Sequence, residues 1–387
     1  MAEIRQRAIA SGKALGELSE NLQRTLARHE AAVAEPFVGV HTPNGMQSGL
    51  YRLTSNGAPT GSIRASVQAF LATLDPEVAR DAQFDLESDN WRRWSNIHRF
   101  LMRHGALLED LEAIQREAAL GVLGVSLSPA GAQLAVDIMK LNGVIGDLCG
   151  HPEAFSEWLY WMSVMGEPSA TEPWGWQIDG HHLIINCFVL GNQLVMTPMF
   201  MGSEPVAAAG SRFGDLRVFA EEERAALAMM SSLDGAQRAQ AILAEELPSD
   251  VFTNAFRDNV ELAYEGIGHD QLDATQQGLL LDLISVYVGR LRADHAALKM
   301  AEVSAHLSET YFAWMGGDGP ESVFYYRVHS PVLLIEFDHQ SGVVFDNTEP
   351  SHAHIHTVMR TPNGNDYGKD LLRQHYEQVP HAAQAAR

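Results

Sequence analysis

Cysteine is scarce in this chain, whose 387 residues include only Cys149 and Cys187. Neither residue lies in a CxxC pattern, so the sequence excludes a thiolate zinc finger. Two isolated cysteines provide no disulfide framework, which favours a reducing compartment over secretion. The N-terminal sequence MAEIRQRAIASGKALGELSE also lacks the apolar segment of a secretory signal. We therefore expect a cytoplasmic protein.

Positive charge and long apolar runs are scarce as well. Lys and Arg number 27 against 49 Asp and Glu, which gives a formal net charge of −22. This charge opposes binding to nucleic acid and to anionic membranes. No run approaches the ~20 apolar residues that span a bilayer; the run 279–288 is too short and contains Asp282. We expect neither nucleic acid nor membrane as a partner, while the Ala-rich N-terminal arm leaves a homo-oligomer open.

Motifs of several common enzyme classes are also missing. The sequence contains no GxGxxG dinucleotide fingerprint and no GxSxG nucleophile elbow. The glycine-rich segment 316–320 lacks the lysine and the following helix of a phosphate loop. The chain is 46% hydrophobic and 20% charged, an ordinary profile for a globular protein with a sizeable core.

The apolar pattern predicts an α+β fold, with a helical N-terminal part and a C-terminal, mainly antiparallel sheet flanked by helices. We divide the chain into an arm and irregular connection (1–60), a helical part (61–168) and an α+β part (169–387). One compact domain from residue 61 onward is the alternative. We find no internal repeat in the sequence.

Local signals predict several boundaries. Ser128 and Pro129 are typical of a helix start, and Asn142-Gly143 predicts the end of that helix. Gly191-Asn192 separates two apolar runs and predicts a β-hairpin turn. Two further strands are expected in SVFYYRV and PVLLIEFDH, followed by a histidine-bearing strand and a final helix.

The clearest indication of chemistry is a row of histidines at every second position: His352, His354 and His356. Alternate side chains of a strand point to one face, so the three imidazoles would project together. Imidazole is the commonest protein ligand for transition metals, and the row therefore predicts a metal site. The spacing suits zinc, iron, copper or manganese equally. The alternative is a half-exposed strand whose polar face carries histidine.

Two more positions would add ligands or a base. His181 and His182 follow Gly180 at the start of an apolar strand, where one or both would bind the metal. A single core histidine bonded to the backbone is the alternative. Glu336 lies inside LLIEFDH, and a carboxylate in an apolar strand is costly to bury unless it is paired or metal-bound. Glu336 would be a ligand or the general base, unless its side chain lies on an exposed face.

Two groups of residues would contact the substrate: the segment that follows the histidines, and a pair of tryptophans. Arg360 and Asp366 would bind its polar groups, with Arg360 clamping a carboxylate, or the two would form a structural pair across the turn. Tyr367 would donate to a developing oxyanion, with packing as the alternative. Trp174 and Trp176 would line an apolar pocket for a small organic substrate, although core packing is the default for aromatic residues.

Several segments form an ordered set along the chain. They are RRWSN, IQREAALGVLGVSLSPAGAQ, WGWQIDGHHL, FMGSEPV, FAEEERAALAMMSSLDGAQRAQAIL, FYYRVHSPVLLIEFDH and HIHTVMRTPNGNDYGKDLLRQHYE. Together they resemble a bacterial family, the domain of unknown function numbered 3500, from about residue 60 to residue 378, and the motif HxHTxxRTPNGxDYG is specific. The resemblance implies no particular metal, substrate or activity. The resemblance also implies that certain positions recur in the family, and that His352 is less closely tied to this pattern. The recurring positions are the His pair at 181–182, Glu336, the HIH of 354–356, Arg360 and 366–368.

These residues together predict a metal-dependent enzyme of hydrolase or lyase type that cleaves a small organic substrate. His354, His356 and one or both of His181 and His182 would hold a divalent transition metal, with zinc favoured and iron or copper as alternatives. The metal would activate water or polarise a carbonyl. A non-haem iron or copper oxygenase with the same site is a second hypothesis, and a non-catalytic metal- or ligand-binding protein is a third.

Overall fold

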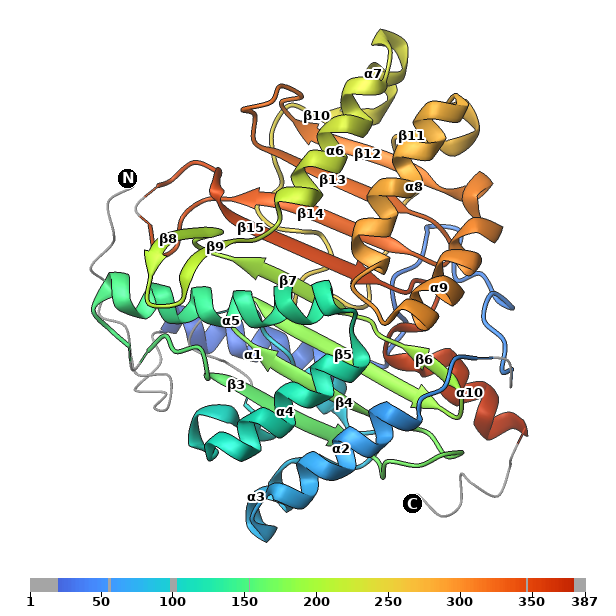
Figure 1. Ribbon diagram of the computed structural model, residues 1–387. Coiled ribbons are helices and arrows are strands. Elements are labelled where there is room, and N and C mark those ends of the chain that lie inside the picture. Colours follow the sequence, from blue (N-terminus) through green and yellow to red (C-terminus); the bar gives the residue numbers. More distant parts are fainter. Residues whose placement is uncertain (1–19, 55–56, 98–102, 153, 346, 379–387) are drawn as a thin grey trace.

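The computed structural model of the protein describes residues 20–54, 57–97, 103–152, 154–345 and 347–378. These residues form an α+β fold, as predicted, in which helices cover one face of a large sheet (Figure 1). Among the described residues, no helix combines the length and the apolar character needed to cross a membrane.

Thirteen strands form the sheet, and ten of them follow one continuous order. From edge to edge these are β1 (Gln83–Phe84), β3 (Tyr160–Met165), β4 (Trp174–Gly180), β5 (Leu183–Leu190), β7 (Met199–Ser203), β15 (Ser351–Arg360), β14 (Leu334–Gln340), β13 (Phe324–His329), β12 (Tyr311–Gly316) and β10 (Ile242–Ala244). The others are β2 (Ala106–Leu107), β6 (Gln193–Val195) and β11 (Ile267–Gly268), which pair with β3, β5 and β12. All pairs are antiparallel except β1–β3 and β10–β12. A separate hairpin consists of β8 (Ala207–Ser211) and β9 (Gly214–Arg217).

Most helices pack on one face of the sheet and bury its apolar side chains (Figure 1). This layer contains α2 (Gly61–Thr73), α4 (Ala113–Ser126), α5 (Pro129–Cys149), α6 (Ala220–Ser232), α8 (Ala274–Val288) and α9 (Ala293–Ala305). Two short helices, α3 (Pro76–Asp81) and α7 (Gly235–Ala241), follow α2 and α6. The remaining helices, α1 (Glu20–Ala34) and α10 (Lys369–Gln378), pack with long loops against a second apolar cluster on the opposite face. We call the first face the helix face and the second the loop face.

The local signals predict some boundaries correctly and miss one. Ser128 caps α5 by accepting a hydrogen bond from the backbone of Gly131, and Gly191 turns the chain between β5 and β6 with a φ of 56°. The predicted end of α5 at Asn142-Gly143 is wrong, because the helix continues to Cys149. Tertiary contacts override the signal: the Asn142 side chain bonds to the backbone of Ser156, and Gly143 leaves room for neighbouring side chains.

The sheet consists of two similar halves, although the sequence shows no repeat. Each half contains two helices, a short parallel edge strand, a short antiparallel strand, two more helices and a run of antiparallel strands. A shift of 150 residue numbers carries the paired residues of β3, β4 and β5 onto those of β12, β13 and β14. For example, the pair Met162–Ile178 of β3 and β4 corresponds to Phe312–Val328 of β12 and β13. The pair Gln177–Asn186 of β4 and β5 corresponds to Arg327–Glu336 of β13 and β14.

A pseudo-twofold axis relates the two halves. A shift of 160 carries β7 onto β15, since the pair Ile185–Met199 corresponds to Ile335–Met359. Met199 and Met359 also pair with each other where β7 meets β15, so the axis passes between them. The predicted division into a helical part (61–168) and an α+β part (169–387) is therefore wrong, because β3 from the first part pairs with β4 from the second. One sheet extends across both parts.

The N-terminal arm packs on its own chain and covers the loop face. Residues 1–19 lie outside the described part, but in α1 the ring of His29 stacks on Phe256 at 3.8 Å. Arg92 ties the end of α1 to the body of the protein through the backbone of Val33 and the carboxylate of Asp258. The arm therefore forms part of the covering of the loop face.

Each half contains a glycine that packs against a backbone carbonyl. We expect substitution of either glycine to destabilise the protein. Gly105 and Gly266 have φ values of 97° and 90°, and an added Cβ would lie 2.5 Å from the carbonyl oxygen of Met162 or 2.1 Å from that of Phe312. Gly105→Ala and Gly266→Ala should each lower the free energy of unfolding by at least about 2 kcal/mol, measured by denaturant titration. Gly124→Ala in α4 meets open space and should be neutral or raise stability by up to about 1 kcal/mol. Equal stability of all three variants would contradict this packing.

Candidate metal centre

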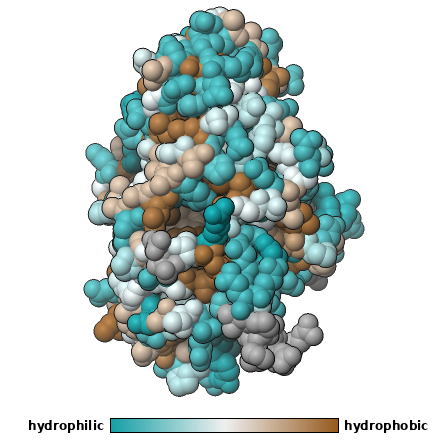
Figure 2. Space-filling model, turned by 90° about the vertical axis from the view of Figure 1, so that its right-hand side faces the viewer, coloured by the Kyte–Doolittle hydropathy of each residue, from teal (hydrophilic) through white to brown (hydrophobic). Residues whose placement is uncertain are grey.

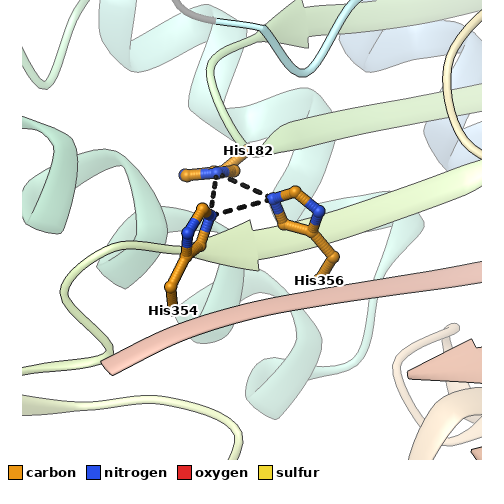
Figure 3. Close-up of side chains that lie close together, drawn as sticks. All are labelled: His182, His354 and His356. Atoms are coloured by element: carbon orange, nitrogen blue, oxygen red, sulfur yellow. Dashed lines mark hydrogen bonds between the residues drawn. The ribbon is translucent and has the colours of Figure 1, made fainter. Parts of the chain in front are cut away.

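Three imidazoles converge in the structure: those of His182, His354 and His356. Their Nε2 atoms form a triangle with edges of 3.0 Å between His354 and His356, 3.1 Å between His182 and His356, and 3.2 Å between His182 and His354 (Figure 3). All three side chains are nearly buried, with exposed fractions of 5%, 3% and 6% in chain order. We call these residues the histidine triad.

The hydrogen bonds on the far side of the rings determine which nitrogen carries the proton. The Nδ1 of His354 lies 2.8 Å from the carbonyl oxygen of Ser341, and the Nδ1 of His356 lies 2.9 Å from a carboxylate oxygen of Asp250. Both oxygens are acceptors, so each Nδ1 donates, and in the neutral rings each Nε2 presents a lone pair. Lone pairs that face each other at 3.0 Å repel, and a bound cation removes that repulsion.

Local electrostatics favour a neutral ring of His354 and a charged carboxylate of Asp250. Burial, reinforced by the neighbouring His356, lowers the pKa of His354 to about 3. Burial also opposes the charge of Asp250, but the contacts of its carboxylate with His356 and Asn254 outweigh that effect and lower its pKa. A metal needs neutral imidazole ligands, and a carboxylate on the remote nitrogen is their usual support.

The dimensions of the triad fit a small transition metal. Three nitrogens at the usual ~2.0–2.1 Å from a tetrahedral zinc ion would lie roughly 3.3 Å from one another. The observed edges of 3.0–3.2 Å are close to that value. Three protein ligands leave one position of a tetrahedral ion for water or substrate, which is the ligand number of catalytic zinc sites.

Neighbouring strands bring the three histidines together. His182 occupies the two-residue turn between β4 and β5 with a φ of 63°, a backbone conformation that is uncommon outside glycine. His354 and His356 lie on β15, and β7 runs between that strand and the turn. Gly202 of β7 pairs with His356, and an added Cβ would lie 3.0 Å from the ring of His356 and 3.3 Å from that of His182. The two rings can therefore approach only because position 202 has no side chain.

The third histidine of the predicted row belongs to another cluster. The pairing of β14 with β15 shifts between His339 and Gln340, and this bulge breaks the alternation before His354. His352 instead lies 2.6 Å from Glu223, whose carboxylate also accepts from His339 at 3.0 Å. The row of three therefore splits into two residues of the triad and one residue of a Glu223–His339–His352 group.

His181 lies beside the triad but outside it. Its ring stacks on that of His182 with centroids 3.9 Å apart, and its Nδ1 lies 2.8 Å from the side-chain oxygen of Asn142 on α5. The ring of His181 therefore contacts α5, whereas the Nε2 of His182 points toward those of His354 and His356. Of the predicted pair, only His182 contributes an Nε2 to the triad, and the prediction of His181 as a ligand is corrected.

Glu336 supports the fold rather than the triad. Its carboxylate is fully buried and accepts four hydrogen bonds, from the backbone N–H groups of Phe252 and Thr253, the hydroxyl of Thr253 and the hydroxyl of Tyr325. With its oxygens filled by these donors, Glu336 has no room to bind a metal or accept a substrate proton. The prediction of Glu336 as a metal ligand or general base is therefore corrected. Its carboxylate holds the loop after Asp250 in place, and we call this arrangement the Glu336 clamp.

Arg360, Asp366 and Tyr367 are also structural. Arg360 and Asp366 have no exposed surface and form a salt bridge of 3.1 Å, which is the structural pair considered as the alternative to substrate binding. Arg360 also donates to the backbone oxygen of Thr253 at 2.7 Å. The hydroxyl of Tyr367 accepts from the indole of Trp94 at 2.9 Å in a closed environment. The predicted contacts of these three residues with a substrate are corrected, because no substrate can reach them.

Trp174 and Trp176 lie on the wrong face for the predicted pocket wall. Both are fully buried in the apolar cluster of the helix face. His182, His354 and His356 project instead to the loop face, where the ring of Phe200 lies 5.1 Å from that of His356. The prediction of the two tryptophans as substrate-binding residues is corrected to core packing.

Two acidic residues complete the surroundings of the triad: Asp250, which the prediction from sequence missed, and Asp338, a weaker candidate at the end of its strand. Asp250 precedes an apolar loop segment, and no residue spacing in the sequence marks it as a site residue. Asp338 pairs with His356 across the strands, is fully buried, and has one carboxylate oxygen without a hydrogen-bond partner among the described residues. Burial, and then the nearby carboxylates of Asp250 and Glu336, raise the pKa of Asp338 well above its usual value. The alternation of β14 places Asp338 on the face of Glu336, and this was the available signal.

Comparison with known proteins identifies the family. The sequence profile of the family described as "Protein of unknown function (DUF3500)" matches residues 56–369. The chain belongs to the DUF3500 family. This confirms the resemblance inferred from the sequence motifs. No curated protein and no solved structure matches. The matched span contains all strands of the DUF3500 sheet and the whole histidine triad.

The clamp formed by Glu336 is testable by stability. Glu336→Gln replaces one acceptor oxygen by a donor and leaves at least one buried N–H or hydroxyl unpaired. We expect the free energy of unfolding to fall by about 2–4 kcal/mol in denaturant titration. Glu377→Gln, at an exposed ion pair, should change it by less than about 0.5 kcal/mol. Wild-type stability of Glu336→Gln would show that the buried carboxylate is free for another role.

Proposed function

We propose that this DUF3500 protein is a metal-dependent enzyme whose divalent transition metal is held by His182, His354 and His356. The observation that carries the proposal is the meeting of three Nε2 atoms within 3.2 Å, with two rings oriented by acceptors on their Nδ1 atoms. Zinc is the favoured ion, because all three ligands are imidazoles and the set contains no carboxylate.

A catalytic role is favoured over a structural one by the number of ligands. Structural zinc sites have four protein ligands, whereas catalytic sites have three and keep one position open. The carboxylates of Asp250 and Glu204 lie 2.9 Å and 3.7 Å from the Nδ1 atoms of His356 and His354, on the far side of the rings from the converging Nε2 atoms. Asp338 groups with Asp250 and His356, and the set of three converging imidazoles contains no carboxylate. The triad also lies just below the surface, since its rings retain a few per cent of exposure and the Asp250 side chain is 27% exposed.

Hydrolase or lyase chemistry on a small organic substrate is the reaction class that this arrangement supports. A bound zinc ion supplies a water of pKa near ~7 or polarises a carbonyl. In the protein, Asp250 holds the Nδ1 proton of His356 and the backbone oxygen of Ser341 holds that of His354. Both contacts keep the rings in one tautomer and orientation. The recess of the triad favours a small molecule over a polymer.

Two features support the proposed cytoplasmic location and the proposal that nucleic acid is not a partner. Cys149 and Cys187 are both unpaired, which agrees with a reducing, cytoplasmic location. The net charge of −22 argues against nucleic acid as the partner. A non-haem iron or copper oxygenase would use the same three histidines, and the metal analysis below distinguishes it from a zinc enzyme. A non-catalytic metal-binding protein would lack the open position.

Elemental analysis of protein purified without added metal tests the site directly. We expect about one zinc ion per chain in the wild type, and loss of most of it in His182→Ala, His354→Ala and His356→Ala. His352→Ala should retain the metal, because His352 belongs to the Glu223–His339–His352 group. Unchanged metal in the His354→Ala/His356→Ala double variant would refute the site. Stoichiometric redox-active iron or copper would replace the hydrolase proposal by the oxygenase.

Asp250 provides a second test that leaves all three ligands in place. Asp250→Asn removes the carboxylate that accepts the Nδ1 proton of His356, and we expect zinc affinity to fall about 10- to 100-fold. The affinity is measured by competition with a chromophoric chelator. Asp270→Asn is the matched control, since this carboxylate is 72% exposed and lies beside a histidine outside the triad. Equal affinity of the two variants would argue against a supporting role for Asp250.

A further inference from the structure

The pseudo-twofold axis gives the histidine triad a counterpart at the other end of the central strands. The shift of 150 that relates β5 to β14 carries His182 onto Val332. In the second half Asp338 pairs with His356, and in the first half the equivalent Phe188 pairs with Val195, so Val195 takes the place of His356. Neither Val332 nor Val195 carries a metal-binding group.

Val195, the counterpart of His356, lies at a cavity. The cavity has a volume of about 390 Å³, and Leu194 and Met196 line it together with Val195. It lies where α9, β6 and the segment before residue 55 come together, on the right-hand side of Figure 1. Figure 2 views this side directly and shows a hollow near its middle with apolar residues around it.

The lining combines an aliphatic wall with polar and charged side chains. Leucine and methionine side chains from five parts of the chain form the aliphatic wall: Leu50, Leu194, Met196, Leu291, Leu298, Met359 and Leu371. Arg52, Lys299 and Glu302 also line the cavity. An apolar wall with a few polar groups is the composition of small-molecule sites, and the volume lies within their usual range of about 300–1,000 Å³.

The charged groups leave donors for a ligand. The ammonium of Lys299 is 13% exposed and donates to the backbone oxygen of Val332 at 2.7 Å and to Glu302 at 3.3 Å. A third N–H of this ammonium has no partner among the described residues. The guanidinium of Arg52 forms no ion pair within the described ranges. The residues that line the cavity thus carry two cations and one carboxylate, in a chain of net charge −22.

We propose that this cavity is a second binding site, for a small aliphatic carboxylate. The aliphatic chain lies against Leu194, Met196 and Leu298, and the carboxylate accepts from Arg52 and Lys299. The site is separate from the histidine triad and does not depend on the proposed function. The two sites lie at opposite ends of the central strands: the imidazoles meet at one end, and the cavity at the other contains Val195, the counterpart of His356.

Isothermal titration of the full chain with octanoate tests the assignment. We expect saturable binding of one octanoate per chain, at least tenfold tighter than octylamine, whose cationic head lacks an acceptor for Arg52 and Lys299. Arg52→Gln should weaken octanoate binding about tenfold, and Arg224→Gln, at an exposed position outside the cavity, should not. Absence of octanoate binding, or equal binding of octylamine, would overturn the proposal.

A steric variant locates the ligand without disturbing the core. Leu298 lines the cavity and is 45% exposed, so Leu298→Trp should fill the space and abolish binding while the chain remains folded. Leu148→Trp is the control, because Leu148 is also 45% exposed on a helix but does not line the cavity. His354→Ala should bind octanoate like the wild type. Loss of binding in His354→Ala would place the carboxylate at the triad instead, and unchanged binding in Leu298→Trp would place it elsewhere; either result overturns the assignment.

Discussion

The pairing of β7 with β15 is the contact on which the rest of this structure depends. It joins the two halves of the sheet along the pseudo-twofold axis, where Met199 lies opposite Met359. It also creates the histidine triad, because His182 comes from the first half and its partner His356 lies 174 residues away in the second. Gly202, in the strand between them, leaves the space in which the rings meet. Neither half could form the triad alone.

The two faces of the sheet are stabilised by different interactions. The helix face is apolar and is covered by helices with matching apolar sides. The loop face contains buried charge, and such charge is stable only when each group has a partner. Arg360 pairs with Asp366, Arg92 with Asp258, and Glu336 accepts four hydrogen bonds from the loop above it. Residues with the chemistry of an active site therefore serve mainly to fasten the loops and the arm to this face.

Equivalent positions in the two halves have taken different roles. Gln177 and Asn186 form a hydrogen bond of 2.6 Å where Arg327 and Glu336 stand in the second half, so one half uses amides and the other uses charges at the same place. Both pairs hold loops: Gln177 donates to the backbone of Trp91, and Glu336 accepts from that of Phe252. The triad and the cavity differ in the same manner. A common backbone thus supports distinct chemistry at its two ends.

By itself, the sequence determined the α+β class and the strands β13, β14 and β15, because these depend on local periodicity and on residue type. The family resemblance singled out His354 and His356 from the row of three histidines. The sequence also narrowed the third ligand to two adjacent histidines. Only the tertiary structure decided between His181 and His182, since the Nδ1 of His181 bonds to Asn142 while the Nε2 of His182 meets those of His354 and His356. The bulge in β14–β15 removed His352, and the burial of Glu336 and Arg360 among donors and acceptors removed them from the site. These outcomes depend on which strands become neighbours and where a register shifts, and such long-range contacts leave no periodic signal in the chain.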